Sequence, residues 1–132
     1  MVILIKKALS NSIKEVELES ANHFSSIISK TSNRPTFKVQ QTTLDQEMKK
    51  LCIKKVDFIK MNVEGSEVDT LKGGTHTLIK TNHLAISCHK INGVNTAELI
   101  QPILEKSGFK VKFLRRKKLI IDFGHIDAYG FR

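Results

Sequence analysis

Four polar side chains crowd one short stretch of the chain, VDFIKMNVEGSEVDTLKGG at residues 56–74. Lys60, Asn62, Glu64 and Glu67 follow an apolar run and precede two adjacent glycines. Carboxylates and an amide in such a position can accept hydrogen bonds from a ligand, hold a divalent cation, or act as a base. The alternative is structural, because the helix dipole stabilises negative charge in the first turn of a helix.

The neighbouring residues predict that this stretch joins a strand to a helix. Apolar residues predict a strand over 56–62. Ser66 followed by Asp69 is a helix-start pattern, and Gly73 and Gly74 predict where that helix ends. In open α/β sheets, ligands bind beyond the carboxyl ends of the strands, where loops lead into helices. The polar stretch therefore lies where a binding site is expected.

Apolar runs and alternation predict most of the remaining elements. Thr43 and Gln46 form a capping-box pattern before an apolar helical face, and Pro102 predicts a kink or a later start in the last helix. Residues 20–35 are rich in Ser, Asn and Thr and read as a loop. The predicted strands are 2–5, 15–19, 36–41, 83–89, 109–114, 119–123 and 127–131, and the predicted helices are 44–53, 75–81 and Asn95 to Gly108.

This order of elements predicts an α/β fold in a single domain over residues 1–132. Residues 1–42 supply an N-terminal strand and a hairpin formed by 15–19 and 36–41, and residues 43–132 form the α/β core. The alternation predicts a mostly parallel sheet. Its final strands are too closely spaced for helical crossovers, so the sheet should end in an antiparallel hairpin.

The chain is strongly basic, with a net charge of +9 from 22 Lys plus Arg against 13 Asp plus Glu. Such a balance favours anionic partners without specifying a fold. The densest run, KVKFLRRKK at 110–118, could contact the phosphates of a nucleic acid. Its single aromatic residue, Phe113, offers little for stacking bases. A solvated hairpin tip is the preferred interpretation, so a nucleic acid is not the expected partner.

Cysteine and histidine spacing gives no sign of a metal site. Cys52 and Cys88 stand in no CxxC pattern and are expected to be buried. His89 ends a predicted strand beside the polar stretch, either as a catalytic group or as a hydrogen-bonded structural residue. The apolar run at 2–5 is too short for a signal peptide, and no run reaches the length of a membrane helix. The expected location is therefore the cytoplasm, away from membranes.

The polar stretch also resembles the signature of the FkbM family of S-adenosylmethionine-dependent methyltransferases. That signature is an apolar strand, then Ile-Lys-x-Asp-x-Glu-Gly-x-Glu, then Leu-Lys-Gly. Residues 39–45, the opening KKALS and LAISCH at 84–89 are similar to other segments of the family. The likeness covers almost the whole chain and implies a Rossmann-like methyltransferase fold.

The resemblance implies methyl transfer from S-adenosylmethionine to an oxygen of a small molecule or sugar, by in-line transfer. Glu64 and His89 are then the expected catalytic residues, in polar contact with the acceptor. Asn62, Gly65 and Glu67 are the expected cofactor-binding residues. Glu67 is expected to orient the site, and no metal is implied.

Three departures from the family pattern stand out. Asn62 replaces the signature Asp, and Ser87 stands where the family usually has a Glu. The first glycine of the chain is Gly65, so the glycine-rich turn that holds the cofactor's methionine part is missing. The resemblance therefore covers a truncated fold, the C-terminal part of a methyltransferase.

In the methyltransferase sheet order, the missing strands would lie beside strand 56–62. That strand is left with an open apolar edge, which is an association hazard. Either residues 2–6 pair with it, or two chains pair as a homodimer. A partner chain that supplies the missing half is a further possibility. The competing class of function is a non-catalytic remnant that dimerises or binds a partner.

Overall fold

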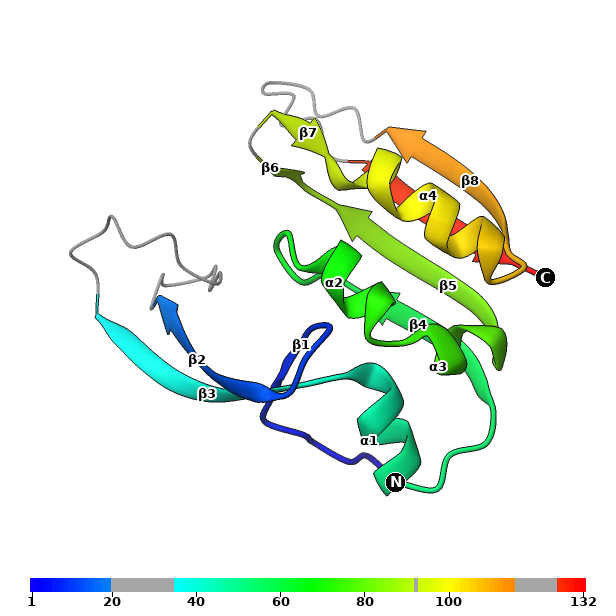
Figure 1. Ribbon diagram of the computed structural model, residues 1–132. Coiled ribbons are helices and arrows are strands. Elements are labelled where there is room, and N and C mark those ends of the chain that lie inside the picture. The colour runs from blue at the N-terminus through cyan, green and yellow to red at the C-terminus, as the bar shows by residue number, and fades with distance from the viewer. Residues whose placement is uncertain (20–34, 92, 116–125) are drawn as a thin grey trace.

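The computed structural model describes residues 1–19, 35–91, 93–115 and 126–132. Its main layer is a four-stranded sheet in the order β4-β5-β9-β8 (Figure 1), formed by β4 (Val56–Met61), β5 (Thr81–Cys88), β9 (Ile126–Phe131) and β8 (Lys110–Arg115). The predicted strand 119–123, the basic residues 116–118 and all but the last residue of the predicted loop 20–35 lie outside the described residues.

The predicted, mostly parallel sheet is wrong in one respect. β4 pairs with β5 in parallel, but β9 pairs antiparallel with both β5 and β8. β4, β5 and β8 therefore run in one direction, and β9 runs against them between two of these strands. The sheet does end in an antiparallel pair, but the predicted hairpin partner 119–123 lies outside the described residues. There β8 pairs with β9, with Lys110 opposite Phe131 at one end and Arg115 opposite Ile126 at the other.

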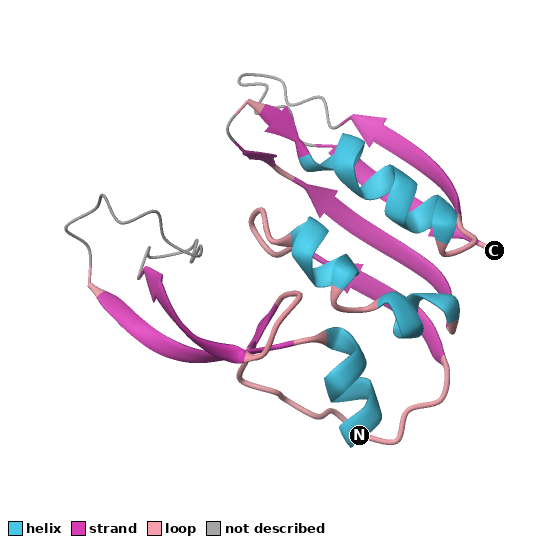
Figure 2. Cartoon of the chain, viewed as in Figure 1, coloured by secondary structure: helices cyan, strands magenta, loops and turns pink. Residues whose placement is uncertain are grey.

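Three helices cover one face of this sheet (Figure 2): α2 (Glu67–Lys72), α3 (Thr75–Ile79) and α4 (Thr96–Lys106). Apolar side chains of the helices pack against sheet residues such as Ile86 and form a fully buried core. The helix residues of this core are Leu71, Leu78, Ile100 and Leu104. Burying each such side chain stabilises the fold by about 1.5–3 kcal/mol relative to leaving it exposed. This core holds the strand ends in place.

α4 begins at Thr96 and continues through Pro102, so the expected later start is wrong. The side chain of Asn95 caps it by accepting a hydrogen bond from the backbone N–H of Ala97. Gly108 follows the helix with a φ of 87°, in the left-handed region that favours glycine. The cap and the glycine were both predicted.

α1 (Leu44–Lys50) is shorter than the predicted helix 44–53. The predicted cap is present, because the Thr43 hydroxyl accepts a hydrogen bond from the backbone N–H of Gln46. The helix ends early since Cys52 has a φ of 55°, outside the helical region. Similarly, the predicted helix 75–81 ends at Ile79, and Thr81 already belongs to β5.

A separate three-stranded sheet precedes the main one, in the order β1-β3-β2. β2 (Lys14–Glu19) and β3 (Thr36–Thr42) form the predicted antiparallel hairpin, and β1 (Ala8–Leu9) lies parallel to β3. The loop after β1 packs against α2, where the Thr70 hydroxyl donates to the carbonyl of Leu9. A Cβ at position 73 would collide with the carbonyl oxygen of Ser10, which explains the glycine there.

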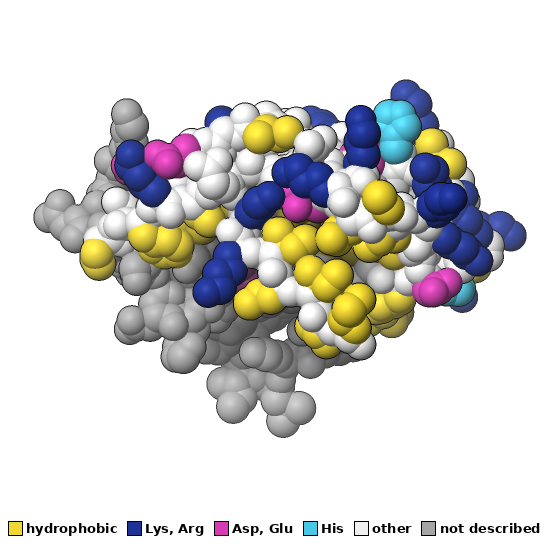
Figure 3. All heavy atoms as spheres, turned by 90° about the horizontal axis from the view of Figure 1, so that it is seen from below, with side chains coloured by type: hydrophobic (Ala, Val, Ile, Leu, Met, Phe, Trp, Pro, Cys, Tyr) yellow, Lys and Arg dark blue, Asp and Glu magenta, His cyan; other side chains and the backbone are white. Residues whose placement is uncertain are grey.

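The predicted strand over residues 2–5 is wrong. Those residues form no strand, and Val2 is 96% and Leu4 78% exposed. Exposed apolar side chains gather on the lower face of the molecule (Figure 3), where the N-terminus lies beside α1 in Figure 1. An apolar run forms a buried strand only where neighbouring strands can take up its backbone hydrogen bonds. Among the described strands β4 pairs only with β5, so the expected pairing of 2–6 with β4 is wrong as well.

Candidate functional site

The loop that follows β4 turns sharply before α2 begins. Glu64 has a φ of 46° and Gly65 a φ of 103°, so two successive residues lie in the left-handed region. The backbone N–H of Ser66 donates to the carbonyl of Val63 at 3.1 Å and closes the turn. This conformation brings the side chain of Glu64 back over the end of β5.

His89 follows β5 and is fixed to the start of α4 by two backbone contacts. Its N–H donates to the hydroxyl of Thr96 at 3.0 Å, and its carbonyl accepts from the Thr96 N–H at 2.9 Å. The imidazole lies between two carboxylates. Nδ1 is 2.7 Å from Glu67 Oε1, and Nε2 is 3.3 Å from Glu64 Oε2. Each ring nitrogen of His89 therefore lies against one carboxylate oxygen.

Glu67 is the most buried member of the group, with a side chain that is 0% exposed. As the first residue of α2, it also accepts a hydrogen bond from the Gly65 N–H to Oε1 at 3.0 Å. Its second oxygen, Oε2, is buried and has no hydrogen-bond partner among the described residues. A buried acceptor without a donor costs about 1–3 kcal/mol. Oε2 is therefore available to a donor that the described residues do not supply.

The predicted site residues lie together in the fold. We call Asn62, Glu64, Gly65, Glu67 and His89 the strand-end cluster. Asn62 is exposed and is the loosest member, with Nδ2 at 3.5 Å from Glu64 Oε1. Both interpretations of the carboxylates are compatible with this geometry, because Glu67 also stands in the first turn of α2.

A second polar group connects β4, β5 and β9. The ammonium group of Lys60 donates to the Ser87 hydroxyl at 2.9 Å and to the carbonyl of Met61 at 3.1 Å. Ser87 in turn donates to Asp127 Oδ1 at 3.1 Å. The sequence placed Lys60 in the polar stretch and gave no role to Asp127. Asp127 could have been found only by pairing β9 with β5, which sets it directly across from Ser87.

The two cysteines differ in environment. Cys88 is buried as predicted, and Cys52 is exposed, contrary to prediction. Burial is the main cause that raises the pKa of the Cys88 thiol, to about 11, and the charge of Glu67 raises it further. The thiol therefore stays protonated near neutral pH and does not act as a nucleophile.

Two cavities lie near the ends of β4. One of about 360 Å³ adjoins the strand-end cluster and is lined by Gly65, Val68, Asp69, Ile91, Val94, Thr96 and Leu99. Another of about 400 Å³ lies at the opposite end of the strand, lined by residues such as Val56, Lys54 and Lys80. Of these two cavities, only the first is lined by a member of the strand-end cluster, Gly65. Within the described ranges, no cluster of three or more His, Cys, Asp or Glu side chains is arranged to hold a metal ion.

Comparison with known proteins decides the family. The model of the methyltransferase FkbM domain matches residues 2–131. The chain belongs to the FkbM methyltransferase family. No curated protein and no solved structure matches it.

Membership of the FkbM family gives the strand-end cluster a context. The match spans both the N-terminal sheet and the main sheet. Two of the departures noted in the sequence are replaced residues, Asn62 within the FkbM signature and Ser87 in the later strand. Asp127 places a carboxylate 3.1 Å from the Ser87 hydroxyl, next to the position where the family usually has a Glu. No described helix of this FkbM chain is long and apolar enough to cross a membrane.

Proposed function

We propose that the chain transfers a methyl group from S-adenosylmethionine to a hydroxyl oxygen of a small molecule or sugar. The observation that carries the proposal is the position of the His89 ring between Glu64 and Glu67, at the carboxyl ends of β4 and β5. Membership of the FkbM family supports the reaction class. The strand-end position supports the location, since ligands of open α/β sheets bind there.

The residues present fit the charged end of the cofactor. S-adenosylmethionine supplies a methyl group on a positively charged sulfonium and carries a free amino group. Glu64 and the unpartnered Glu67 Oε2 offer negative charge and an acceptor. Gly65 and Asn62 would lie along the cofactor, and the cavity beside Gly65, about 360 Å³, is within the size range of small-molecule sites.

The chain's own residues would position the acceptor and take up its proton. His89 already contacts a carboxylate through each ring nitrogen, so Glu64 is the better base. Glu64 would accept the hydroxyl proton of the acceptor, and S-adenosylmethionine would supply the methyl group when bound. His89 holds Glu64 in place, and Glu67 holds His89. Alignment of the reacting atoms supplies much of the rate.

Among the described strands β4 pairs only with β5, which leaves one edge beside the strand-end cluster where a further contribution to the site can join. We propose that a second copy or a partner chain provides it, and that the open edge of β4 is where it joins. A dimerising remnant that binds no cofactor is the alternative. A cytoplasmic location also stays a prediction.

Calorimetric titration tests the proposal and separates it from the alternative. Purified protein is titrated with S-adenosylmethionine and with S-adenosylhomocysteine, which lacks the sulfonium charge, and its oligomeric state is measured on the same sample. We expect saturable binding, tighter for S-adenosylmethionine than for S-adenosylhomocysteine. The Glu64→Gln variant should bind S-adenosylmethionine about tenfold more weakly, because it loses a charged hydrogen bond. His76→Gln is the matched control, because its ring is 85% exposed and lines the cavity at the opposite end of β4. A folded protein that gives no heat with either ligand would support the remnant.

A further inference from the structure

The main sheet has a second face, opposite to the helices. The sheet residues that belong to the core, or pack on it, point to the helix side; examples are Ile59, Leu84, Ile86, Ala128 and Phe113. Side chains alternate between the faces of a strand, so the residues between them point the other way. All three helices that cover the sheet lie on the first side (Figure 2).

Strand register arranges this second face in rows. One row contains Phe58 on β4, His83 on β5, Phe131 on β9 and Lys110 on β8. The next row contains Lys60, Ala85, Tyr129 and Lys112. We call these two rows the aromatic face. Neither row contains a carboxylate.

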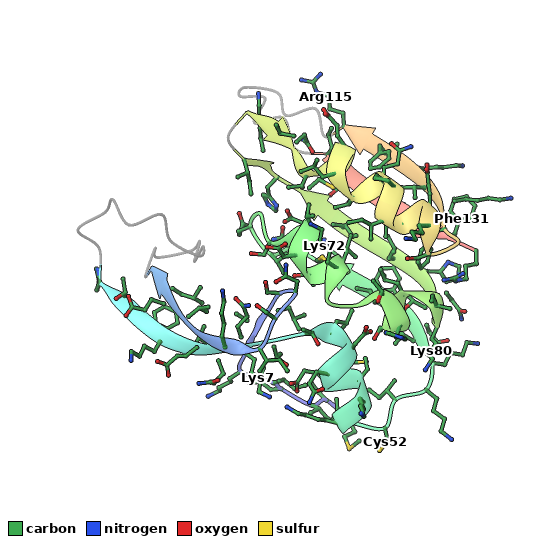
Figure 4. All side chains as sticks on the ribbon, in the orientation of Figure 1. Lys7, Cys52, Lys72, Lys80, Arg115 and Phe131 are labelled. Atoms are coloured by element: carbon green, nitrogen blue, oxygen red, sulfur yellow. The ribbon has the colours of Figure 1, made fainter. Side chains whose placement is uncertain are left out.

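The aromatic residues of this face are open to solvent. Phe58 is 57% and Tyr129 41% exposed, and Phe131, whose position Figure 4 labels, is half-buried. The ammonium group of Lys112 lies 5.7 Å from the centre of the Phe131 ring, so charge and ring share one surface. Tyr129 and Phe131 are two residues apart on one strand, about 7 Å. Neighbouring bases of an extended single-stranded nucleic acid can reach two rings at this spacing.

We propose that the aromatic face binds single-stranded nucleic acid. Aromatic side chains on an exposed sheet stack unpaired bases, and lysines beside them contact the phosphates. Lys110 and Lys112 supply positive charge within the face, and the chain as a whole carries +9. Lys60, by contrast, is held on Ser87 beside Asp127 of the next row. A duplex would hide the faces of its bases from the three rings, so the occupant is single-stranded.

The sequence could not predict this surface. Phe113, the aromatic residue within the basic run, packs against the core. The exposed rings come from positions 58, 129 and 131, which are brought together only by the β4-β5-β9 order. The face is separate from the strand-end cluster, so the proposal holds whether or not the chain transfers methyl groups.

Tyr129 provides a built-in reporter, because the chain has one tyrosine and no tryptophan. The probe is an oligouridylate of about 12 nucleotides, within the usual site size. We expect it to quench tyrosine emission on binding. With two phosphate contacts, from Lys110 and Lys112, the affinity should fall about sevenfold between roughly 50 and 200 mM salt.

Matched variants separate stacking from general charge. Phe58→Leu and Phe131→Leu should each weaken binding about tenfold, the cost of one stacked base. Phe37→Leu is the control, an exposed ring (46%) on the separate β3 strand, and should change little. The double variant Lys110→Gln/Lys112→Gln removes two charges from the aromatic face. It should lower the affinity more than the double variant Lys72→Gln/Lys106→Gln, which removes two charges from the helix side of the sheet (Figure 4 labels Lys72).

Three results would overturn the proposal. Unquenched tyrosine emission at saturation would mean that bases do not stack on this face. Equal losses in both lysine pairs, or equal affinity for a duplex, would mean binding by net charge alone. Self-association that Phe58→Leu abolishes, without any effect of the oligonucleotide, would assign the face to a second copy of the chain.

Discussion

His89 and Glu67 join the end of β5 to the first residue of α2 through a contact of 2.7 Å. The Glu67 side chain is fully buried, and the His89 side chain is 12% exposed. A buried carboxylate is tolerated only when it is paired or hydrogen-bonded. The pair therefore supports the fold as well as the proposed chemistry.

Removing His89 should destabilise the protein. His89→Ala leaves the Glu67 carboxylate buried without its nearest donor, and the expected loss in free energy of unfolding is about 2–4 kcal/mol. His76→Ala removes the exposed His76–Asp45 contact and should cost less than about 1 kcal/mol. Urea unfolding of the two variants measures both values. Equal losses would contradict the role of the buried pair.

Acid should remove a contribution that Glu47 makes to stability. The hydrogen bond from Lys7, labelled in Figure 4, is the main cause that lowers the pKa of Glu47 to about 2, and the one from Thr42 follows. Because the folded-state pKa lies below the ordinary value of 4.5, the contribution is complete above that value and is lost as pH falls toward 2.

Unfolding measured against pH tests this contribution. The difference in stability between wild type and Glu47→Gln should shrink as the pH is lowered through that window. Glu15→Gln, which breaks an exposed pair with Lys38, serves as the control and should show little change. A wild-type advantage over Glu47→Gln that stays constant down to about pH 2 would refute the assignment.

The two thiols should react at very different rates. Cys52 is exposed, whereas Cys88 is fully buried with a pKa raised to about 11, mainly by burial and then by the charge of Glu67. A thiol reagent should label one thiol per native chain rapidly and the second only after denaturant is added. Mass spectrometry of peptides identifies the site. Rapid native labelling of Cys88 would contradict its burial.

Arg132 should be a major support of β9. Its guanidinium donates to the carbonyls of Leu78, Thr81 and Ser107, each at 2.7 Å, and lies 4.6 Å from the ring centre of Phe109. Arg132→Lys keeps the charge but loses the fork of donors, so we expect about 1–3 kcal/mol of destabilisation. Thermal unfolding at matched pH measures it. A lysine variant as stable as wild type would show that charge alone matters there.

Gly65 should tolerate no side chain. A Cβ there would collide with Ile91, and the φ of 103° is unfavourable for alanine. Gly65→Ala should therefore be destabilising, and Ile91→Ala in the same chain should restore only the part due to the collision. The double-mutant cycle separates the steric part from the backbone part. Strictly additive effects would mean that the two residues do not meet.

Local signals predicted local structure well. Thr43 and Asn95 cap their helices as expected, and the polar residues of the strand-end cluster lie together because two strand ends and a helix start converge there. Long-range pairing was the difficulty. Nothing in the sequence near β9 indicates that this strand inserts between β5 and β8. For this reason the sheet was wrongly predicted to be mostly parallel. The position of Asp127 and the aromatic face follow from the same pairing, so they were not predicted.

The apolar residues 2–5 mislead for a related reason. An apolar run shows that a strand could be buried, but burial also needs a free neighbouring edge. The open edge of β4 is such an edge, yet in the described structure the run lies elsewhere, with Val2 and Leu4 exposed. Hydrophobicity alone does not choose between these positions.

The most direct test of the central claim is to map the binding of S-adenosylmethionine onto backbone amides by nuclear magnetic resonance. The account predicts that the amides of residues 62–67 and of His89 shift most, with saturation, and that Glu64→Gln weakens the effect without unfolding the protein. Shifts confined to other parts of the chain, or no shift in a folded sample, would contradict a cofactor site at the ends of β4 and β5.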